Sequence, residues 1–257
     1  MMFFVKSCKV KDNVLKSGTI KIGSLSEYRK IESNSEVEDE KEGHFNLNVN
    51  INDKFLTFDE FNKMNNSNHS SHIAHIKSFN SGPRLNNGMK CKFIADYKWV
   101  NHNRFIFCLS GLQDHILATG IFKSYPDYWY VQDLNLKGLA NTLAEYLLAE
   151  VKEKLGQGEE VFWCEVEASN LKVVTKIQKI IYQDRDFILD DFNFHQEKGS
   201  LLKLLDNVRF IKPARFSHEE EYRVVFDFYN KEEIVFPKIK YLIIDGDGAA
   251  KLANPKG

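Results

Sequence analysis

Three consecutive glutamates precede an apolar run in residues 216–226, and this segment carries the residue types best suited to chemistry. Because side chains of a strand alternate between its faces, Glu219, Glu221 and Arg223 are predicted to share one face, with Glu220 on the other. Two carboxylates on one face can hold a sugar hydroxyl and orient an attacking nucleophile, as chemistry at an anomeric carbon requires. A solvated strand end with a plain ion pair between Glu221 and Arg223 would give the same pattern.

A second polar group follows a short apolar strand near the N-terminus. Apolar residues recur at helical spacing over 25–31, which predicts a short helix that Ser24 caps and that carries Tyr28 and Arg29. The residues that follow, 32–42, are strongly acidic. We expect them to form a solvated or functional loop.

Motifs for metals and phosphates are weak or missing. His69, His72 and His75 repeat every third residue without an acidic or cysteine ligand close by, so a polar loop is favoured over a metal site. Asp245 and Asp247 lack the downstream glutamate of a calcium loop and predict a turn. The sequence has no Gly-rich phosphate loop or dinucleotide fingerprint. We therefore predict no metal.

Composition places the chain among soluble globular proteins. It has 257 residues, of which 43% are hydrophobic and 28% charged, and its formal net charge is −1. This balance excludes a global electrostatic footprint for duplex nucleic acid, so a nucleic-acid partner would need a local basic surface. The four cysteines show no paired spacing and lie in or beside apolar runs, which predicts reduced thiols and a cytoplasmic protein. The first apolar run is too short for a signal peptide, and no segment reaches the ~18 to 20 apolar residues of a membrane span.

The apolar pattern predicts many strands and few helices. Alternation over 45–51 indicates an amphipathic strand, the continuous run 105–109 a strand buried on both faces, and leucines at every fourth residue a helix over 139–155. We expect further strands at 2–6, 18–22, 160–166, 208–211, 222–229 and 241–244, and a helix over 201–205. Residues 125–131 are predicted to form a turn that enters a strand, and residues 173–182 a strand pair or a strand with a bulge. Strands and helices do not alternate regularly, so the predicted class is α+β with a largely antiparallel or mixed sheet. We expect a single domain over 1–257, with a polar loop inserted at about 65–87.

Four short blocks together resemble a known family. They are residues 22–32, the end of the acidic segment at Glu42-Gly43, residues 107–110 and residues 216–223. The pattern resembles a bacterial and phage family of ADP-ribosyltransferase-like toxins, which includes the messenger-RNA-modifying toxin of an anti-phage toxin, antitoxin and chaperone system. The resemblance implies a split, largely antiparallel ADP-ribosyltransferase core with NAD as substrate. It also implies a role in antiviral defence and an antitoxin protein as a partner.

The resemblance assigns a role to each glutamate on the shared face. Glu221 would be the catalytic glutamate that binds the 2′-hydroxyl of the nicotinamide ribose and steadies an oxocarbenium-like transition state. Glu219 would orient or deprotonate the acceptor. A glycosidase or nucleotide hydrolase could use the same carboxylates, but the sequence has no second acidic motif of suitable context. A non-enzymatic phage- or defence-associated interaction protein with the same fold is the alternative function.

Four more residues are implied as contacts of NAD. Arg29 would hold the phosphates, since a guanidinium binds two oxygens at once. Tyr28 would stack on nicotinamide, Ser110 would contact the ribose or the nicotinamide amide, and Ser24 completes the set. The plainer alternatives are a helix-surface Arg29, a core-facing Tyr28 and a strand-capping Ser110. The Ser-Thr-Ser and His-Gly strands of well-known members are not found in this sequence.

A locally basic segment leads to the glutamates and points to a nucleic-acid acceptor. Its cations are Lys198, Lys203, Arg209, Lys212 and Arg215. Such a segment can guide single-stranded RNA or DNA, and Phe216, His218 and Trp99 are available to stack on bases. We expect Lys212, Arg215 and His218 to bind nucleic acid, with RNA favoured as the acceptor. A solvated surface is the alternative.

Overall fold

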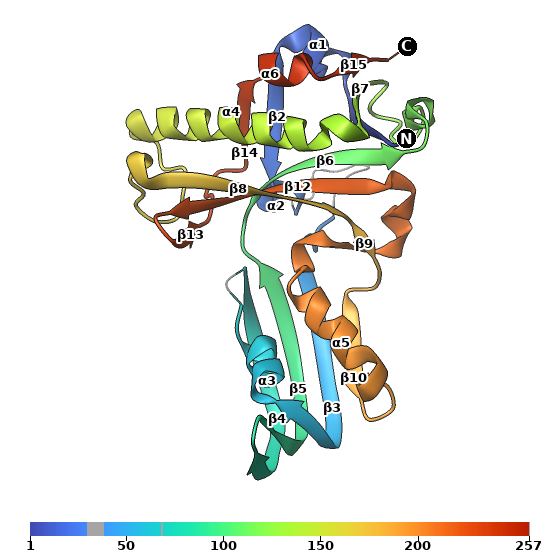
Figure 1. The fold of residues 1–257 in the computed structure, drawn as a ribbon, viewed down its shortest axis with the longest axis vertical. Coiled ribbons are helices and arrows are strands. Elements are labelled where there is room, and N and C mark those ends of the chain that lie inside the picture. The colour runs from blue at the N-terminus through green and yellow to red at the C-terminus, as the bar shows by residue number, and fades with distance from the viewer. Residues whose placement is uncertain (30–38, 68, 257) are drawn as a thin grey trace. The chain divides into compact units, whose positions relative to one another are not determined.

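The computed structural model describes residues 1–29, 39–67 and 69–256, which form two compact units (Figure 1). Unit 1 comprises Met1–Glu42, Asn103–Ile180 and Arg215–Gly257, and unit 2 comprises Gly43–His102 and Ile181–Ala214. Both units combine helices with strands, and the strand pairings are antiparallel in unit 1 and mixed in unit 2, which confirms the α+β class. The single domain over 1–257 stays a prediction, because two compact units of one chain can still unfold together.

Unit 1 is built on a nine-stranded sheet with the order β13-β12-β6-β1-β7-β15, in which β8 also pairs β12 and β14 pairs β2. All the strand pairs of this sheet are antiparallel. The strands are β1 (Phe3–Cys8), β2 (Thr19–Ser24), β6 (Phe105–Leu112), β7 (Asp127–Gln132), β8 (Leu171–Lys179), β12 (Glu221–Asn230), β13 (Glu233–Val235), β14 (Tyr241–Asp245) and β15 (Asn254–Pro255).

The sheet of unit 1 branches at β6. One edge of β6 pairs with β12 over residues 105–110, so the other edge holds both β1, at residues 110–112, and β2, at residues 105–106. Between these two partners the carbonyl oxygen of Cys108 accepts a 3.0 Å hydrogen bond from Lys6 Nζ. A buried carbonyl needs a partner, and here a side chain supplies it where the strands separate.

One long helix, α4 (Leu136–Gly156), covers one face of this sheet. Its Leu139, Leu143 and Leu147 lie one above another on the helix and are fully or almost fully buried against Val224 and Phe226 of β12. The predicted helix over 139–155 is therefore confirmed. The short helices of unit 1 are η1 (Val10–Asp12), α1 (Val14–Ser17), α2 (Leu25–Tyr28), η2 (His115–Ala118), η3 (Asp133–Asn135), η4 (Ala168–Asn170), η6 (Ala214–Glu219) and α6 (Asp247–Ala250).

Unit 2 contains a four-stranded sheet with the order β10-β3-β5-β4. Its strands are β3 (His44–Thr57), β4 (Ser70–Leu85), β5 (Gly88–Asn101) and β10 (Asp186–Asp190), with β9 (Ile181–Tyr182) and β11 (Ile211–Lys212) forming a separate pair. Phe45, Leu47, Val49 and Ile51 are buried while the asparagines between them face the other side, as the alternation predicts. The helices are α3 (Phe58–Asn65), α5 (Phe194–Leu205) and η5 (Val208–Phe210).

The polar segment 65–87 is not a loop, and this prediction was wrong. Residues 70–85 form β4, which pairs antiparallel with β5 over nearly its whole length. Asn, Ser and His have weak strand propensity, but backbone pairing to a neighbouring strand outweighs it. On a strand His72 and His75 point to opposite faces, and His72 stacks on Trp99 with ring centroids 4.6 Å apart. No group of three His, Cys, Asp or Glu side chains in the described residues is arranged to hold a metal.

Three smaller predictions also differ from the structure. Residues 208–210 of the predicted strand 208–211 form the short helix η5, and only Ile211 lies in a strand, β11. Residues 160–166 form only one isolated bridge, Phe162 to Pro237, and not a strand. The helix predicted over 201–205 begins earlier, at Phe194, because the Phe194 side chain joins the core of unit 2. Across the described part of the chain, no helix has the length and apolar character needed to cross a bilayer.

Candidate functional site

The three glutamates lie in three different conformations. Glu221 is the first residue of β12, Glu219 ends η6, and Glu220 between them has a φ of 46°. The prediction that Glu219 shares a strand face with Glu221 was therefore wrong, because the left-handed residue breaks the strand alternation. Both Glu219 and Glu221 are nevertheless buried, whereas Glu220 is half-exposed and pairs with Lys179 at 2.6 Å.

Alternation holds from Glu221 onward. Tyr222 and Val224 pack on the α4 face, and Glu221 and Arg223 point to the opposite face. Directly opposed residues of paired strands share a face, and the register places Ser110 opposite Glu221 and Cys108 opposite Arg223. The predicted site residues Glu221 and Ser110 are thus neighbours on β12 and β6.

Arg223 lies between two buried carboxylates. Its Nε and Nη2 donate to Glu221 Oε1 at 2.9 and 2.7 Å. Its Nη1 and Nη2 donate to Glu42 Oε1 and Oε2 at 2.9 and 3.4 Å. The side chains of Glu42, Arg223 and Glu221 are only 2%, 2% and 6% exposed. Burial lowers the pKa of Arg223, but the two carboxylates outweigh it and the pKa lies well above its usual value.

Nothing in the sequence indicates that Glu42 belongs to the site. The residue was named only as the end of the acidic segment in the family resemblance, but in the structure it binds Arg223, which is 181 positions away in the chain. Residues 32–38 of the predicted acidic loop lie outside the described residues. Gly43 after Glu42 has a φ of 70°, which turns the chain sharply at this point.

Three of the residues predicted to contact NAD, Ser24, Tyr28 and Arg29, lie in or beside α2 of unit 1. Ser24 occupies the N-cap position, but its hydroxyl bonds Ser26 Oγ at 2.9 Å rather than a backbone N–H. The helix runs over Leu25–Tyr28, and residues 30–31 of the predicted helix lie outside the described residues. Arg29 Nε donates to the carbonyl oxygen of Glu42 at 2.6 Å. Arg29 therefore anchors the backbone of the residue that binds Arg223.

Tyr28 lies close enough to Glu221 and Arg223 for their charges to affect its pKa. Burial raises its pKa well above the usual value, and the charges of Cys108, Glu27 and Glu221 raise it further. A Cβ on Gly23 would lie 3.0 Å from the Tyr28 ring and 3.3 Å from its hydroxyl, so the glycine makes room for this side chain. Tyr28 is a neutral phenol packed over β2.

Lys6 and Cys108 complete the surroundings of Glu221. Burial lowers the pKa of Lys6, while Cys108, Cys8 and Glu221 oppose the change. Burial raises the pKa of Cys108 to about 12, and the charge of Glu221 and a hydrogen bond to it add to the increase. Neither residue was predicted for the site, since a lone lysine and a strand cysteine give no motif in the sequence.

The raised pKa of Cys108 predicts an inert thiol. At pH 8 the thiolate fraction of Cys108 would be on the order of a thousandfold below that of an ordinary cysteine, whose pKa is about 8.5. We expect iodoacetamide to label the exposed Cys164 well before Cys108 in the folded protein, as peptide mass spectrometry would show. Equal labelling of both thiols would contradict the buried contact with Glu221.

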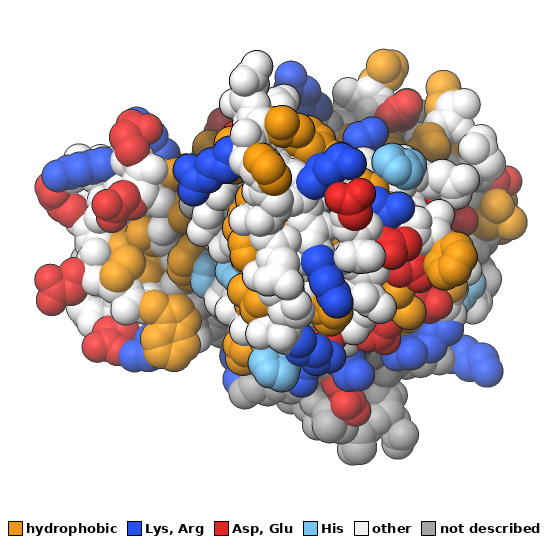
Figure 2. Space-filling view, turned by 90° about the horizontal axis from the view of Figure 1, so that it is seen from below, with side chains coloured by type: hydrophobic (Ala, Val, Ile, Leu, Met, Phe, Trp, Pro, Cys, Tyr) orange, Lys and Arg blue, Asp and Glu red, His pale blue; other side chains and the backbone are white. Residues whose placement is uncertain are grey.

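The residues predicted to bind nucleic acid differ in their exposure. Lys212 is buried in β11 of unit 2, with 3% exposed, so its side chain offers no open contact surface. Arg215 and His218 are exposed in η6 of unit 1, and His218 Nδ1 lies 3.2 Å from the carbonyl oxygen of Arg215. Trp99 and Phe216 are core side chains and do not present free rings for bases, because each is buried. On the face shown in Figure 2, basic and acidic side chains are interspersed.

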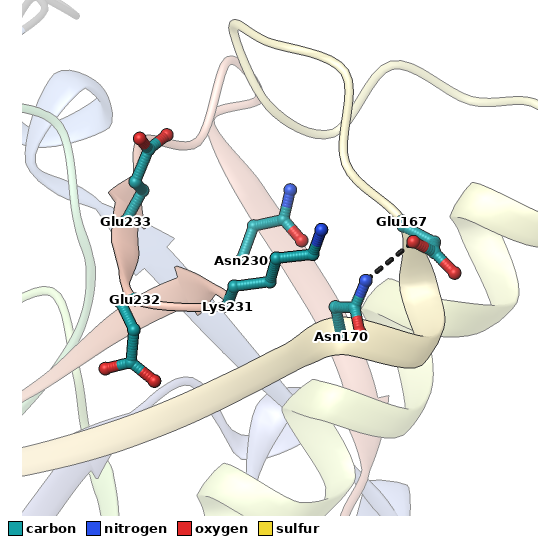
Figure 3. A pocket seen from close by; sticks show the side chains of 6 residues that line it. All are labelled: Glu167, Asn170, Asn230, Lys231, Glu232 and Glu233. Atoms are coloured by element: carbon teal, nitrogen blue, oxygen red, sulfur yellow. Dashed lines mark hydrogen bonds between the residues drawn. The ribbon is translucent and has the colours of Figure 1, made fainter.

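A separate pocket of about 450 Å³ lies beside the turn between β12 and β13 (Figure 3). Asn170 Nδ2 donates to Glu167 Oε2 at 2.6 Å at its rim. The pocket shares no residue with the group around Glu221. It is lined by Glu167, Asn170, Asn230, Lys231, Glu232 and Glu233.

A scan against protein-family models found no match for the chain, and searches of curated proteins and of solved structures found none either.

Proposed function

We propose that the chain is an ADP-ribosyltransferase that cleaves NAD at Glu221. The observation that carries the proposal is the placement of Glu221. It is a buried carboxylate at the first residue of β12, opposite Ser110 of β6, in a sheet that branches at β6. The four-block resemblance to ADP-ribosyltransferase-like toxins supports the same assignment.

In the proposed reaction the bond between the nicotinamide nitrogen and ribose C1′ breaks, and nicotinamide leaves with the bonding electrons. Glu221 accepts a hydrogen bond from the ribose 2′-hydroxyl and stabilises the positive charge that develops on the ribose. An acceptor oxygen or nitrogen then bonds C1′ and loses its proton, and Glu219 is the proposed base. Because the Glu221 side chain is 6% exposed, a bound substrate must displace atoms that now cover it.

The other proposed contacts surround this carboxylate. Ser110 lies opposite Glu221 and would bind the ribose or the nicotinamide amide. Tyr28, whose pKa already responds to Glu221, would stack on the nicotinamide ring. Arg29 would bind phosphate oxygens. Ser24 lies at the start of α2, one turn from Tyr28.

The proposed acceptor is single-stranded nucleic acid, with RNA favoured, and the role is defence against phage with an antitoxin partner. Two exposed residues of η6, the short helix that Glu219 ends, support a nucleic-acid contact; they are Arg215 and His218. The test is to incubate the protein with NAD labelled in its adenylate phosphate and with RNA, single-stranded DNA or protein. Transfer of label to RNA is expected. Label on protein alone would overturn the nucleic-acid acceptor while leaving NAD cleavage in place.

Reversing the charge of Arg215 separates acceptor binding from NAD cleavage. We expect Arg215→Glu to reduce transfer to RNA about three- to tenfold, because one phosphate contact is lost and a repulsive charge replaces it. Release of nicotinamide without RNA should not change. Arg84→Glu in β4 of unit 2, also at an exposed arginine, is the matched control. Equal effects of both variants would show that only overall charge matters.

A second candidate is a non-enzymatic interaction protein of the same fold. The observation that favours it is the ion pair, because Arg223 Nη2 lies 2.7 Å from the Glu221 carboxylate and occupies it. Under this alternative Glu42, Arg223 and Glu221 only hold the fold together. Absence of NAD consumption by the wild-type protein would favour this function over the enzyme.

A further inference from the structure

The strongest unused feature of the molecule is Glu42. Its carboxylate is 2% exposed and binds both terminal nitrogens of Arg223. The same guanidinium donates to Oε1 of Glu221 through Nε and Nη2. Arg223 therefore bridges two carboxylates, one of which is the proposed catalytic group.

The group formed by Glu42, Arg223 and Glu221 carries two negative charges and one positive charge. Without the charge of Glu42 the same three side chains would be neutral in sum, and Arg223 would cancel Glu221. Lys6 and Arg29 add positive charge nearby. Lys6 lies close enough to Glu221 for that charge to affect the pKa of Lys6, and Arg29 donates a hydrogen bond to the Glu42 carbonyl oxygen. These cations do not depend on the Glu42 carboxylate, so its removal shifts the local charge by one unit.

We propose that Glu42 is a positioning residue that holds Arg223 and so keeps the surroundings of Glu221 selective for a cationic ring. The proposal rests on the proposed function, in which the departing nicotinamide is a pyridinium cation in the substrate and a neutral molecule after cleavage. The charge of Glu42 makes these surroundings one unit more negative than they would be without it, and this favours the cation over the neutral ring. The site also releases the product, since the charge that held the ring disappears with cleavage.

The test uses two probes of nearly the same shape, 1-methylnicotinamide, which is a cation, and nicotinamide, which is neutral. We expect the wild type to prefer the cation, and Glu42→Gln to lower that preference about tenfold, the order of effect of one unit charge close by in a partly desolvated site. Glu40→Gln removes the same charge from an exposed position of the same segment and should keep the preference. Glu42→Asp, which keeps the charge, should restore most of it.

The ratio of two affinities distinguishes this role from a merely structural one. General loss of packing in Glu42→Gln would weaken both probes alike, and such a result would overturn the proposal, as would equal preferences in Glu42→Gln and Glu40→Gln. A wild type that binds neither probe would overturn it too. If the preference depends on Glu42 but the wild type leaves NAD intact, the enzyme assignment fails and the charge selectivity stands. If NAD is cleaved and Glu42→Gln keeps its preference, only the role of Glu42 fails.

Discussion

Replacing Glu221 with glutamine is expected to reduce NAD cleavage about a thousandfold or more, because the change removes the charge that would stabilise the oxocarbenium-like transition state. The amide has nearly the shape of the carboxylate and still accepts a hydrogen bond from Arg223 through its oxygen. Substrate binding should therefore fall much less than turnover. Steady-state assays of nicotinamide release, with kcat and KM determined separately, check this expectation.

Glu220→Gln is the matched control for this change. Glu220 is the next residue and loses the same charge, but it is half-exposed and bonded to Lys179 instead of Arg223. A surface ion pair contributes only about 0–1 kcal/mol, so this variant should be stable and active. Similar losses in both variants would contradict a specific role for Glu221.

Replacing Arg223 with methionine is expected to lower the free energy of unfolding by about 3–5 kcal/mol, because it leaves two carboxylates buried without their partner. Glu42 and Glu221 would repel each other in a site where both are almost fully shielded from water. Urea unfolding at pH 7, followed by circular dichroism, measures the loss. Arg215→Met, at an exposed arginine, should change stability by less than about 0.5 kcal/mol.

A triple variant tests the cause of that loss. Glu42→Gln and Glu221→Gln combined with Arg223→Met remove all three charges together. Stability should return most of the way to the wild-type value, since no uncompensated charge remains. If the triple variant is as unstable as Arg223→Met, then lost packing of the arginine stem, and not buried charge, causes the destabilisation.

Local patterns predicted the parts of the site that depend on local geometry. The alternation after Glu221 follows from the period of a strand, so the shared face of Glu221 and Arg223 was correct. The same reasoning failed one residue earlier. Glu220 takes a left-handed conformation that no residue type in the run 219–221 announces, and Glu219 therefore belongs to η6.

Local sequence patterns could not predict contacts between residues that are far apart in the chain. Glu42 is one of 36 acidic residues, and nothing in its neighbours marks it as the partner of Arg223. Lys6 enters the group only because β6 changes partners beside it. The burial of Lys212 likewise depends on the pairing of β11 with β9, two short strands whose contact no apolar period predicts.

The segment 65–87 shows a different limit. Its composition is typical of a loop, but the composition of a segment indicates only whether its side chains favour water. It does not report whether a neighbouring strand binds the backbone, as β5 binds β4 here. Strands at the edge of a sheet tolerate polar residues because one edge and part of each face meet solvent.

The catalytic role of Glu221 is tested most directly by nicotinamide release from NAD with the purified wild-type protein, followed by proton NMR without added acceptor. Water is then the only acceptor, so that ADP-ribose forms. We expect a steady loss of the NAD nicotinamide signals and an equal gain of free nicotinamide, absent with Glu221→Gln and present with Glu220→Gln. NAD that stays intact with the wild-type protein, both alone and with RNA added, would contradict it. Glu221 would then be one member of a buried ion-pair network with Arg223 and Glu42.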